Sequence, residues 1–168
     1  EISNSVIDGT KIGIRDNYST GHCNANQVTL KNVTNGFQSF GDLGFTFNLS
    51  DSYVEASNIG IYSYSTGHRA QLVVDNCEIK AVAHGILGYQ DDIIQNSSIT
   101  NTGSPSGYGV SAKTGFKCSN NIITNFDTGI AYNYSTNTIV NNNVTIDCTT
   151  EVLKTGSTDF VYVDNFSR

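Results

Sequence analysis

The sequence predicts an all-β solenoid, on the strength of its composition, an internal repeat and a regular alternation of apolar and polar residues. Of the 168 residues, 56 are Asn, Ser or Thr, whereas Met and Trp are absent and Pro occurs once. Strong helix formers are scarce, and β-branched residues, Tyr and Gly are plentiful, which excludes an all-helical domain. The length suits a single domain over residues 1–168.

A repeat of about 23 residues supports the fold prediction. Its first anchor is a Gly followed by an apolar residue, with Glu in place of Gly in the seventh copy. In chain order the copies are Gly13-Ile14, Gly36-Phe37, Gly60-Ile61, Gly85-Ile86, Gly109-Val110, Gly129-Ile130 and Glu151-Val152. Because the copies stay in phase along the chain, each is expected to form one coil of a stack.

The second anchor is an aliphatic residue that precedes the Gly by six positions in most copies. It is Ile7, Leu30, Val54, Ile79, Ile99, Ile123 and Val144. In the fifth copy the Gly follows Ile99 by ten positions, and the surplus residues 103–106 have the composition of a loop insertion. Apolar and polar residues alternate around these anchors, so the anchors are predicted to point inward from short strands.

Segments such as Ser119–Ile130 resemble the right-handed parallel β-helix proteins of the pectin-lyase-like superfamily, and the resemblance covers essentially the whole chain. It implies a right-handed parallel β-helix of about seven coils, stacked ~4.8 Å apart. Open ends of such a stack expose strand edges that invite aggregation. We therefore expect the chain to be a fragment of a larger assembly or to be capped by one, as flanking domains or a homo-oligomer would do.

Equivalent positions in successive coils form columns with distinct expected roles. One position after the aliphatic anchor, the signs alternate and favour pairing between strands: Asp8, Lys31, Glu55 and Lys80. Two positions after it, recurring Asn predicts a ladder of side-chain amides: Asn32, Asn101 and Asn125. Three positions after the Gly, small residues predict an inward column near a narrow corner: Ser39, Ser63, Gly88 and Ala112.

The four cysteines fall in different columns: Cys23, Cys77, Cys118 and Cys148. Disulfides between adjacent coils need matched columns to bring the Cα atoms within ~7 Å, so buried free thiols are predicted. No Cys or His spacing suits zinc, and neither a metal nor a cofactor is predicted.

The outer face of the predicted solenoid supplies the candidate binding residues. Four aromatic residues lie two or four positions after the glycines of coils two to four: Phe40, Tyr62, Tyr64 and Tyr89. Such a row suits stacking on the sugar rings of a polysaccharide or surface glycan, with His68 and Arg69 as a polar rim. An aromatic ladder beside the core, or an oligomer interface, would place the same residues together.

Asp91, Asp92 and His84 are the candidates for catalysis, because glycosidases need two carboxylates roughly 5–9.5 Å apart. The Asp91-Asp92 pair resembles the adjacent aspartates of many β-helix hydrolases. The Asn-Thr-Asp, Gly-His-Gly and Arg-Ile-Lys segments of polygalacturonase-like enzymes are absent, as is the Asp-Pro-His of alginate-epimerase-like ones. Whether the chain is an enzyme is left open.

The sequence is compatible with three functions. The leading one is an extracellular carbohydrate-recognising module, of the kind found in phage tail spikes and bacterial surface adhesins, at a cell surface or on a virion. The second is a polysaccharide hydrolase or lyase that uses outer-face carboxylates, and the third is a structural fibre segment. A net charge of −6 argues against nucleic acid, and the absence of an 18-residue apolar run argues against a membrane partner.

Overall fold

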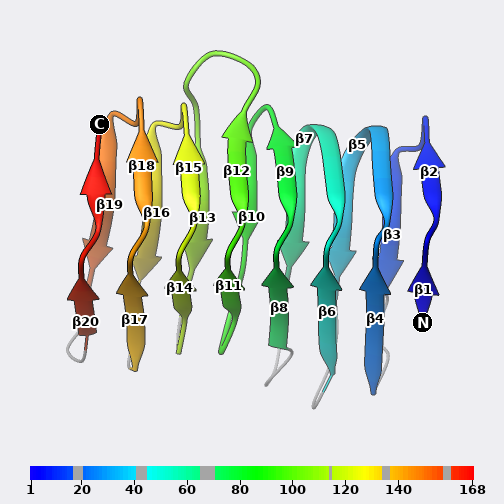
Figure 1. The fold of residues 1–168 in the computed structure, drawn as a ribbon, viewed down its shortest axis with the longest axis horizontal. Helices are drawn as coiled ribbons and strands as arrows, with labels where there is room; N and C mark the ends of the chain where they lie inside the picture. Colours follow the sequence, from blue (N-terminus) through cyan, green and yellow to red (C-terminus); the bar gives the residue numbers. More distant parts are fainter. Residues whose placement is uncertain (17–20, 41–44, 65–70, 114, 134–136, 157–159) are drawn as a thin grey trace.

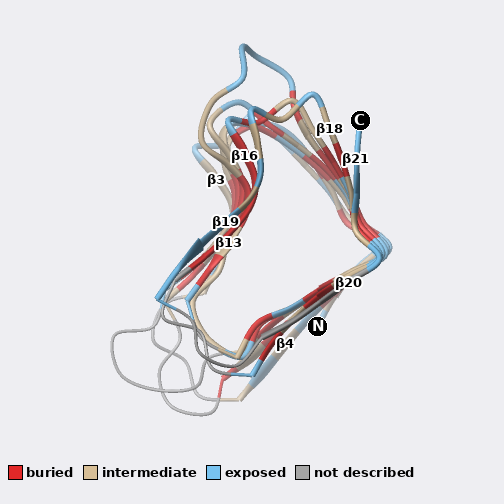
Figure 2. Ribbon diagram, turned by 90° about the vertical axis from the view of Figure 1, so that its left-hand side faces the viewer, coloured by how far each residue is buried: buried red, intermediate tan, exposed pale blue. Residues whose placement is uncertain are grey.

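The computed structural model describes residues 1–16, 21–40, 45–64, 71–113, 115–133, 137–156 and 160–168, and every regular element among them is a β-strand. The strands stack side by side along one axis, from the N-terminus at one end to the C-terminus at the other (Figure 1). Viewed along that axis, three faces surround a single core lined by buried residues (Figure 2). No helix in these ranges is long and apolar enough to span a membrane.

Each face is a stack of parallel strands, one from each coil. Within the described ranges, the first face is an eight-stranded sheet in the order β1 (Ile2–Ser3), β4 (His22–Asn26), β6 (Thr46–Ser50), β8 (Gln71–Asp75), β11 (Ile93–Gln95), β14 (Lys117–Ser119), β17 (Thr138–Asn141) and β20 (Phe160–Val163). The second face holds β2 (Val6–Asp8), β5 (Thr29–Ser39), β7 (Tyr53–Ser63), β9 (Glu78–Ala81), β12 (Ser98–Asn101), β15 (Ile122–Thr124), β18 (Val144–Ile146) and β21 (Phe166–Ser167).

The third face continues from the second around a corner, because the long strands β5 and β7 run through both. It begins with β3 (Ile12–Asp16), includes the later parts of β5 and β7, and goes on with β10 (His84–Leu87), β13 (Tyr108–Ala112), β16 (Thr128–Asn133) and β19 (Thr150–Thr155). The seven predicted Gly-apolar copies supply one strand each to this face. Their apolar members pair in register from Ile14 to Val152, which confirms the all-β solenoid and the first anchor.

The second anchor is confirmed for six copies and is wrong for the seventh. Ile7 through Ile123 form one buried or partly buried column on the second face. The residue paired with Ile123 is Thr145, which is buried, whereas Val144 pairs with the exposed Ile122. The Thr145 methyl group takes the place of the aliphatic branch and packs toward Gly129, so a polar residue type fills an apolar role.

The predicted amide ladder exists at a different corner. It lies two positions before the aliphatic anchor, where the first face meets the second. There, four successive backbone N–H groups bond side-chain oxygens of the next coil, supplied by Ser97, Asn121, Asn143 and Asn165. At the predicted position, Asn32 bonds the Asp8 carboxylate and Asn125 bonds backbone carbonyls, without a run of amides. The ladder position was wrong because Ser and Asn share the role at the real corner.

The charge column has the predicted register, with Asp8 opposite Lys31 and Glu55 opposite Lys80. The Lys80 ammonium, however, forms its ion pair with Glu78 of its own strand, at 2.8 Å. Lys31 and Lys80 also lie over the ring of Tyr53, at 5.8 and 5.2 Å from its centroid. Pairing along β9 and with an aromatic ring thus replaces the pairing that was expected between strands.

The inward small column follows the prediction, whereas the prediction of buried free thiols holds for two of the four cysteines. Ser39, Ser63 and Ala112 are buried beside the apolar anchors of the third face. Cys77 and Cys118 are buried free thiols, whereas Cys23 and Cys148 are free but only half-buried. Burial raises the pKa of Cys77 to about 11 and that of Cys118 to about 12, so both thiols stay protonated at neutral pH.

Candidate functional site

The four predicted aromatic residues come together on the third face as one continuous row. Phe40 follows β5, Tyr62 lies near the end of β7, Tyr64 directly follows that strand, and Tyr89 follows β10. The ring centroids are 5.9 Å apart for Phe40 and Tyr62, 6.2 Å for Tyr62 and Tyr64, and 5.8 Å for Tyr64 and Tyr89. We call these four residues the aromatic row. It crosses three successive coils and therefore runs along the solenoid axis.

The aromatic row is accessible rather than part of the core. Tyr64 is 39% exposed, and the other three rings are half-buried. The Tyr62 and Tyr64 rings stack at 22°, whereas the contacts at either end of this pair are edge-to-face. Desolvation, together with the nearby Tyr64, raises the pKa of Tyr62, so the Tyr62 phenol is uncharged at neutral pH.

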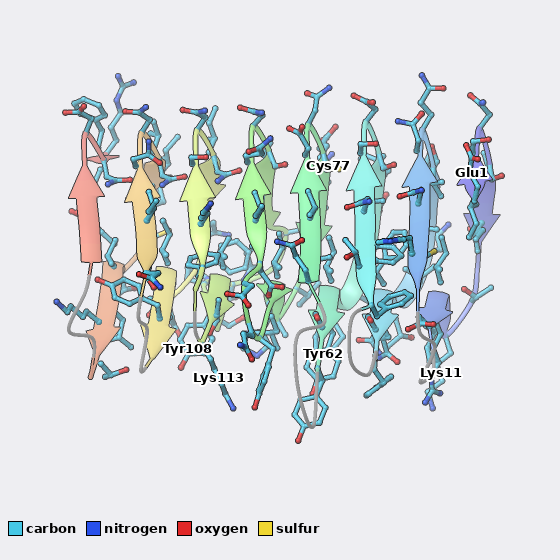
Figure 3. The ribbon with its side chains drawn as sticks, turned by 90° about the horizontal axis from the view of Figure 1, so that it is seen from below. Glu1, Lys11, Tyr62, Cys77, Tyr108 and Lys113 are labelled. Atoms are coloured by element: carbon cyan, nitrogen blue, oxygen red, sulfur yellow. The ribbon has the colours of Figure 1, made fainter. Side chains whose placement is uncertain are left out.

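A basic side chain lies at each end of the aromatic row. The Arg15 guanidinium is 5.0 Å from the Phe40 centroid, and the Lys113 ammonium is 4.7 Å from the Tyr89 centroid. Both distances suit cation–π contacts. Neither residue was predicted from the sequence, although Arg15 shares a column with Tyr62, and Lys113 shares one with Tyr64 and Tyr89. Tyr62, Tyr108 and Lys113 lie along one side of the solenoid, opposite Cys77 (Figure 3).

His84 lies on the same face, where its ring is held by contacts with Tyr108. Its ring stacks on Tyr108, with the centroids 5.5 Å apart, and its Nδ1 accepts a hydrogen bond from the Tyr108 backbone N–H at 3.1 Å. An accepting Nδ1 carries no proton, and burial lowers the pKa of this imidazole. His84 is therefore a neutral, positioned ring at neutral pH, with only Nε2 left to exchange a proton.

A shallow hollow of about 130 Å³ continues the third face beyond Lys113. Its lining residues are Tyr108, Ser111, Ala131, Tyr132, Leu153 and Thr155. The hollow thus combines an aromatic ring, an aliphatic wall and hydroxyl groups. These are the kinds of groups that contact the two faces and the hydroxyls of a sugar.

The two candidate acids occupy very different environments. Asp92 is fully buried, and its carboxylate accepts hydrogen bonds from the backbone N–H groups of Leu72, at 2.8 Å, and Tyr89, at 2.7 Å. Asp91 is exposed, has φ of 54°, and uses its carbonyl to accept a hydrogen bond from Gln71. The prediction of an outer-face pair is wrong for Asp92, because the left-handed turn at Asp91 directs the next side chain into the core.

The burial of the Asp92 carboxyl group makes the stability of the fold depend on pH. Desolvation, opposed by the two N–H groups, raises the pKa of Asp92 from 3.8 to about 7. Between these values the folded chain keeps a proton that the unfolded chain has lost, so this group's contribution to stability falls as pH rises from about 4 to 7 and is constant above. A shift of this size corresponds to on the order of 4 kcal/mol.

We therefore expect Asp92→Asn to remove this contribution from the pH dependence of unfolding. Urea denaturation at pH 4.5, 6 and 8 would show a wild-type stability that falls relative to the variant with rising pH. Asp91→Asn, at the exposed neighbour, is the matched control and should follow the wild type. A constant difference between wild type and Asp92→Asn across this range would contradict the raised pKa.

His68 and Arg69 lie outside the described residues. Among the described residues, no three His, Cys, Asp or Glu side chains come together in a way that could hold a metal ion.

Comparison with known protein families identifies the fold of the chain. Residues 59–167, which are 109 of the 168, match the family described as the right handed beta helix region. Searches of curated proteins and of solved structures gave no match. Since the matched segment covers well over half of the sequence and the coils stack as parallel strands, the chain belongs to the right-handed β-helix family.

Proposed function

We propose that this chain is a carbohydrate-recognising β-helix module that works outside the cell, at a cell surface or on a virion. The observation that supports this proposal is the accessible aromatic row on the third face. A β-helix is a scaffold that hosts many functions, so the argument rests on the side chains of this site rather than on the fold.

The chemistry of the row suits a glycan. Aromatic rings combine a large apolar surface with, in tyrosine, a hydroxyl at the edge. The C–H faces of sugar rings pack on such surfaces, while sugar hydroxyls bond the phenol oxygens and the neighbouring Arg15 and Lys113. Because the row follows the solenoid axis over three coils, it suits a chain molecule lying along the stack.

The third face, which carries the aromatic row, differs in its chemistry from the second face, which carries the charged column. There, Tyr53 donates its hydroxyl to Glu55 at 2.9 Å and is flanked by the ammonium groups of Lys31 and Lys80. Tyr53 is thus surrounded by charges of both signs, whereas each ring of the aromatic row has another ring beside it. Of the two, the aromatic row offers the extended apolar surface that sugar stacking requires.

Tyr64→Ala is expected to weaken polysaccharide binding about tenfold, which is about 1.4 kcal/mol. Its ring is the most exposed of the row and contacts both Tyr62 and Tyr89, so its loss divides the stacking surface. Affinity would be measured by calorimetry against a panel of polyuronates, sulfated glycans and neutral glucans.

Tyr53→Ala is the matched control, because it removes an outer-face tyrosine from another face and should bind as the wild type does. Reducing-end and 235-nm absorbance readings on the same mixtures would detect hydrolysis or lyase activity. Wild-type protein that binds no panel member, but self-associates through a surface that Tyr64→Ala weakens, would replace the proposal with a structural role.

A further inference from the structure

Asp92 stands between two apolar residues, Leu72 and Phe116, in an inward column of the core. It precedes β11 as Leu72 precedes Val73 in β8, and as Phe116 precedes β14, and these equivalent positions point inward. Leu72 and Phe116 are buried, and Asp92 is as buried as they are. A carboxylate among apolar neighbours opposes stability, and such departures from the fold's own pattern mark functional positions.

The Asp92 carboxylate holds the short connection between β10 and β11 from the inside. One oxygen bonds the N–H of Leu72 in the preceding coil, and the other bonds the N–H of Tyr89, three residues earlier in the chain. Gly88 provides the room, because a Cβ at that position would collide with the Asp92 carboxylate. Carboxylate and glycine together therefore fix the path of the backbone through Tyr89.

Tyr89 is the member of the aromatic row that this connection positions. Its carbonyl accepts the Lys113 N–H at 3.0 Å, so its backbone is held from the core by Asp92 and from the next coil by Lys113. Its ring then lies between Tyr64 and the Lys113 ammonium. Without the Asp92 contact, the Tyr89 N–H loses its acceptor and this end of the row loses its support.

We infer that Asp92 is a positioning residue for ligand binding, which holds Tyr89 in the aromatic row at a cost to the stability of the fold. This inference rests on the proposed function. A merely structural residue would make stability and binding change together. Replacing Asp92 with an apolar residue is instead expected to weaken binding without lowering stability.

The protonation of Asp92 is expected to change ligand binding and fold stability in opposite directions. As a carboxylate it offers two full acceptors to the Leu72 and Tyr89 N–H groups, whereas protonation turns one oxygen into a poorer acceptor. Among the described residues, the titratable and charged groups that face this connection are Asp91, beside the carboxylate, Lys117, whose N–H bonds the Asp92 carbonyl, and the Tyr89 phenol with the Lys113 ammonium over its ring. The equivalent inward positions of the neighbouring coils are the apolar Leu72 and Phe116. Binding should therefore strengthen as pH rises, while the Asp92 contribution to stability declines.

The test compares wild type, Asp92→Asn, Asp92→Leu and, as control, Asp91→Asn, with the polysaccharide of the panel that wild type binds most tightly. Wild type and Asp91→Asn are expected to bind about tenfold more tightly at pH 8 than at pH 5. Both Asp92 variants should bind weakly at either pH, with faster hydrogen exchange at the Tyr89 amide. Asp92→Leu should have a urea midpoint at pH 8 no lower than that of wild type.

The outcomes distinguish the inference from the proposed function. If Asp92→Leu binds as wild type does, the inference is overturned and carbohydrate recognition stands. If both Asp92 variants fail to fold, Asp92 is a structural residue and the inference is likewise overturned. If wild type binds no polysaccharide, the proposed function fails, and the inference fails with it.

Discussion

Asn143→Ala should lower the free energy of unfolding by about 3–5 kcal/mol, which is a large part of the stability of an ordinary domain. Asn143 is fully buried in the corner ladder. Its Oδ1 accepts hydrogen bonds from the backbone and side-chain amides of Asn121, and its Nδ2 donates to the Cys118 carbonyl and to Asn165 Oδ1, at 2.9–3.1 Å. Alanine removes all four bonds, so the buried Asn121 backbone N–H loses its acceptor and the Cys118 carbonyl loses the Asn143 amide donor.

Urea denaturation followed by far-ultraviolet circular dichroism would measure this loss. Asn48→Ala is the matched control, because the Asn48 amide makes a surface hydrogen bond to Asn24 on the first face. Its removal should change stability by no more than about 0.5 kcal/mol. An Asn143→Ala midpoint close to that of Asn48→Ala would show that the corner ladder contributes little.

Gly60→Ala is the second substitution with a large expected effect, a loss of about 3 kcal/mol. A Cβ on Gly60 would lie 2.5 Å from Ile79 Cγ2 and 2.6 Å from the Gly85 carbonyl oxygen of the next coil. The carbonyl belongs to the backbone of the stack and cannot move without breaking its ladder. Urea denaturation would again measure the change.

Two comparisons separate this steric effect from a general effect of alanine. Gly103→Ala, in the loop insertion, meets only side-chain atoms, with Val82 Cγ1 at 3.1 Å, and should stay within about 0.5 kcal/mol of wild type. Adding Ile79→Ala to Gly60→Ala removes the methyl group that collides, so the double variant should lose less than the sum of the two single losses. Strictly additive losses would contradict the packing of the two anchors against each other.

This packing explains why the fold could be predicted from the sequence. The Gly of one coil and the aliphatic anchor of the next, as in Gly60 and Ile79, are needed together, so both recur in nearly pure columns. The corner ladder was harder to locate because its column is mixed. At that corner Ser97 provides a hydroxyl oxygen where Asn121 provides an amide oxygen, and the Cys77 thiol contacts the Leu49 carbonyl much as an Asn121 N–H contacts that of Ile94.

The candidate site was predictable where the columns were regular and not where one residue changed the direction of the chain. Tyr62, Tyr64 and Tyr89 follow their glycines at fixed distances, so their meeting on one face could be foreseen. Asp92 could not be placed in this way, because the positive φ of Asp91 reverses the alternation of side chains. A shift of one residue moves a side chain from the solvent to the core.

The corner ladder also gives the solenoid a chemical polarity. At that corner the backbone donor always belongs to the earlier coil and the side-chain acceptor to the later one, from Val28 and Ser52 to Asn143 and Asn165. The two directions along the axis are therefore not equivalent, even though the coils look alike. A coil that extends this stack, from the same chain or another, can continue the pattern only head to tail, with its strands running the same way.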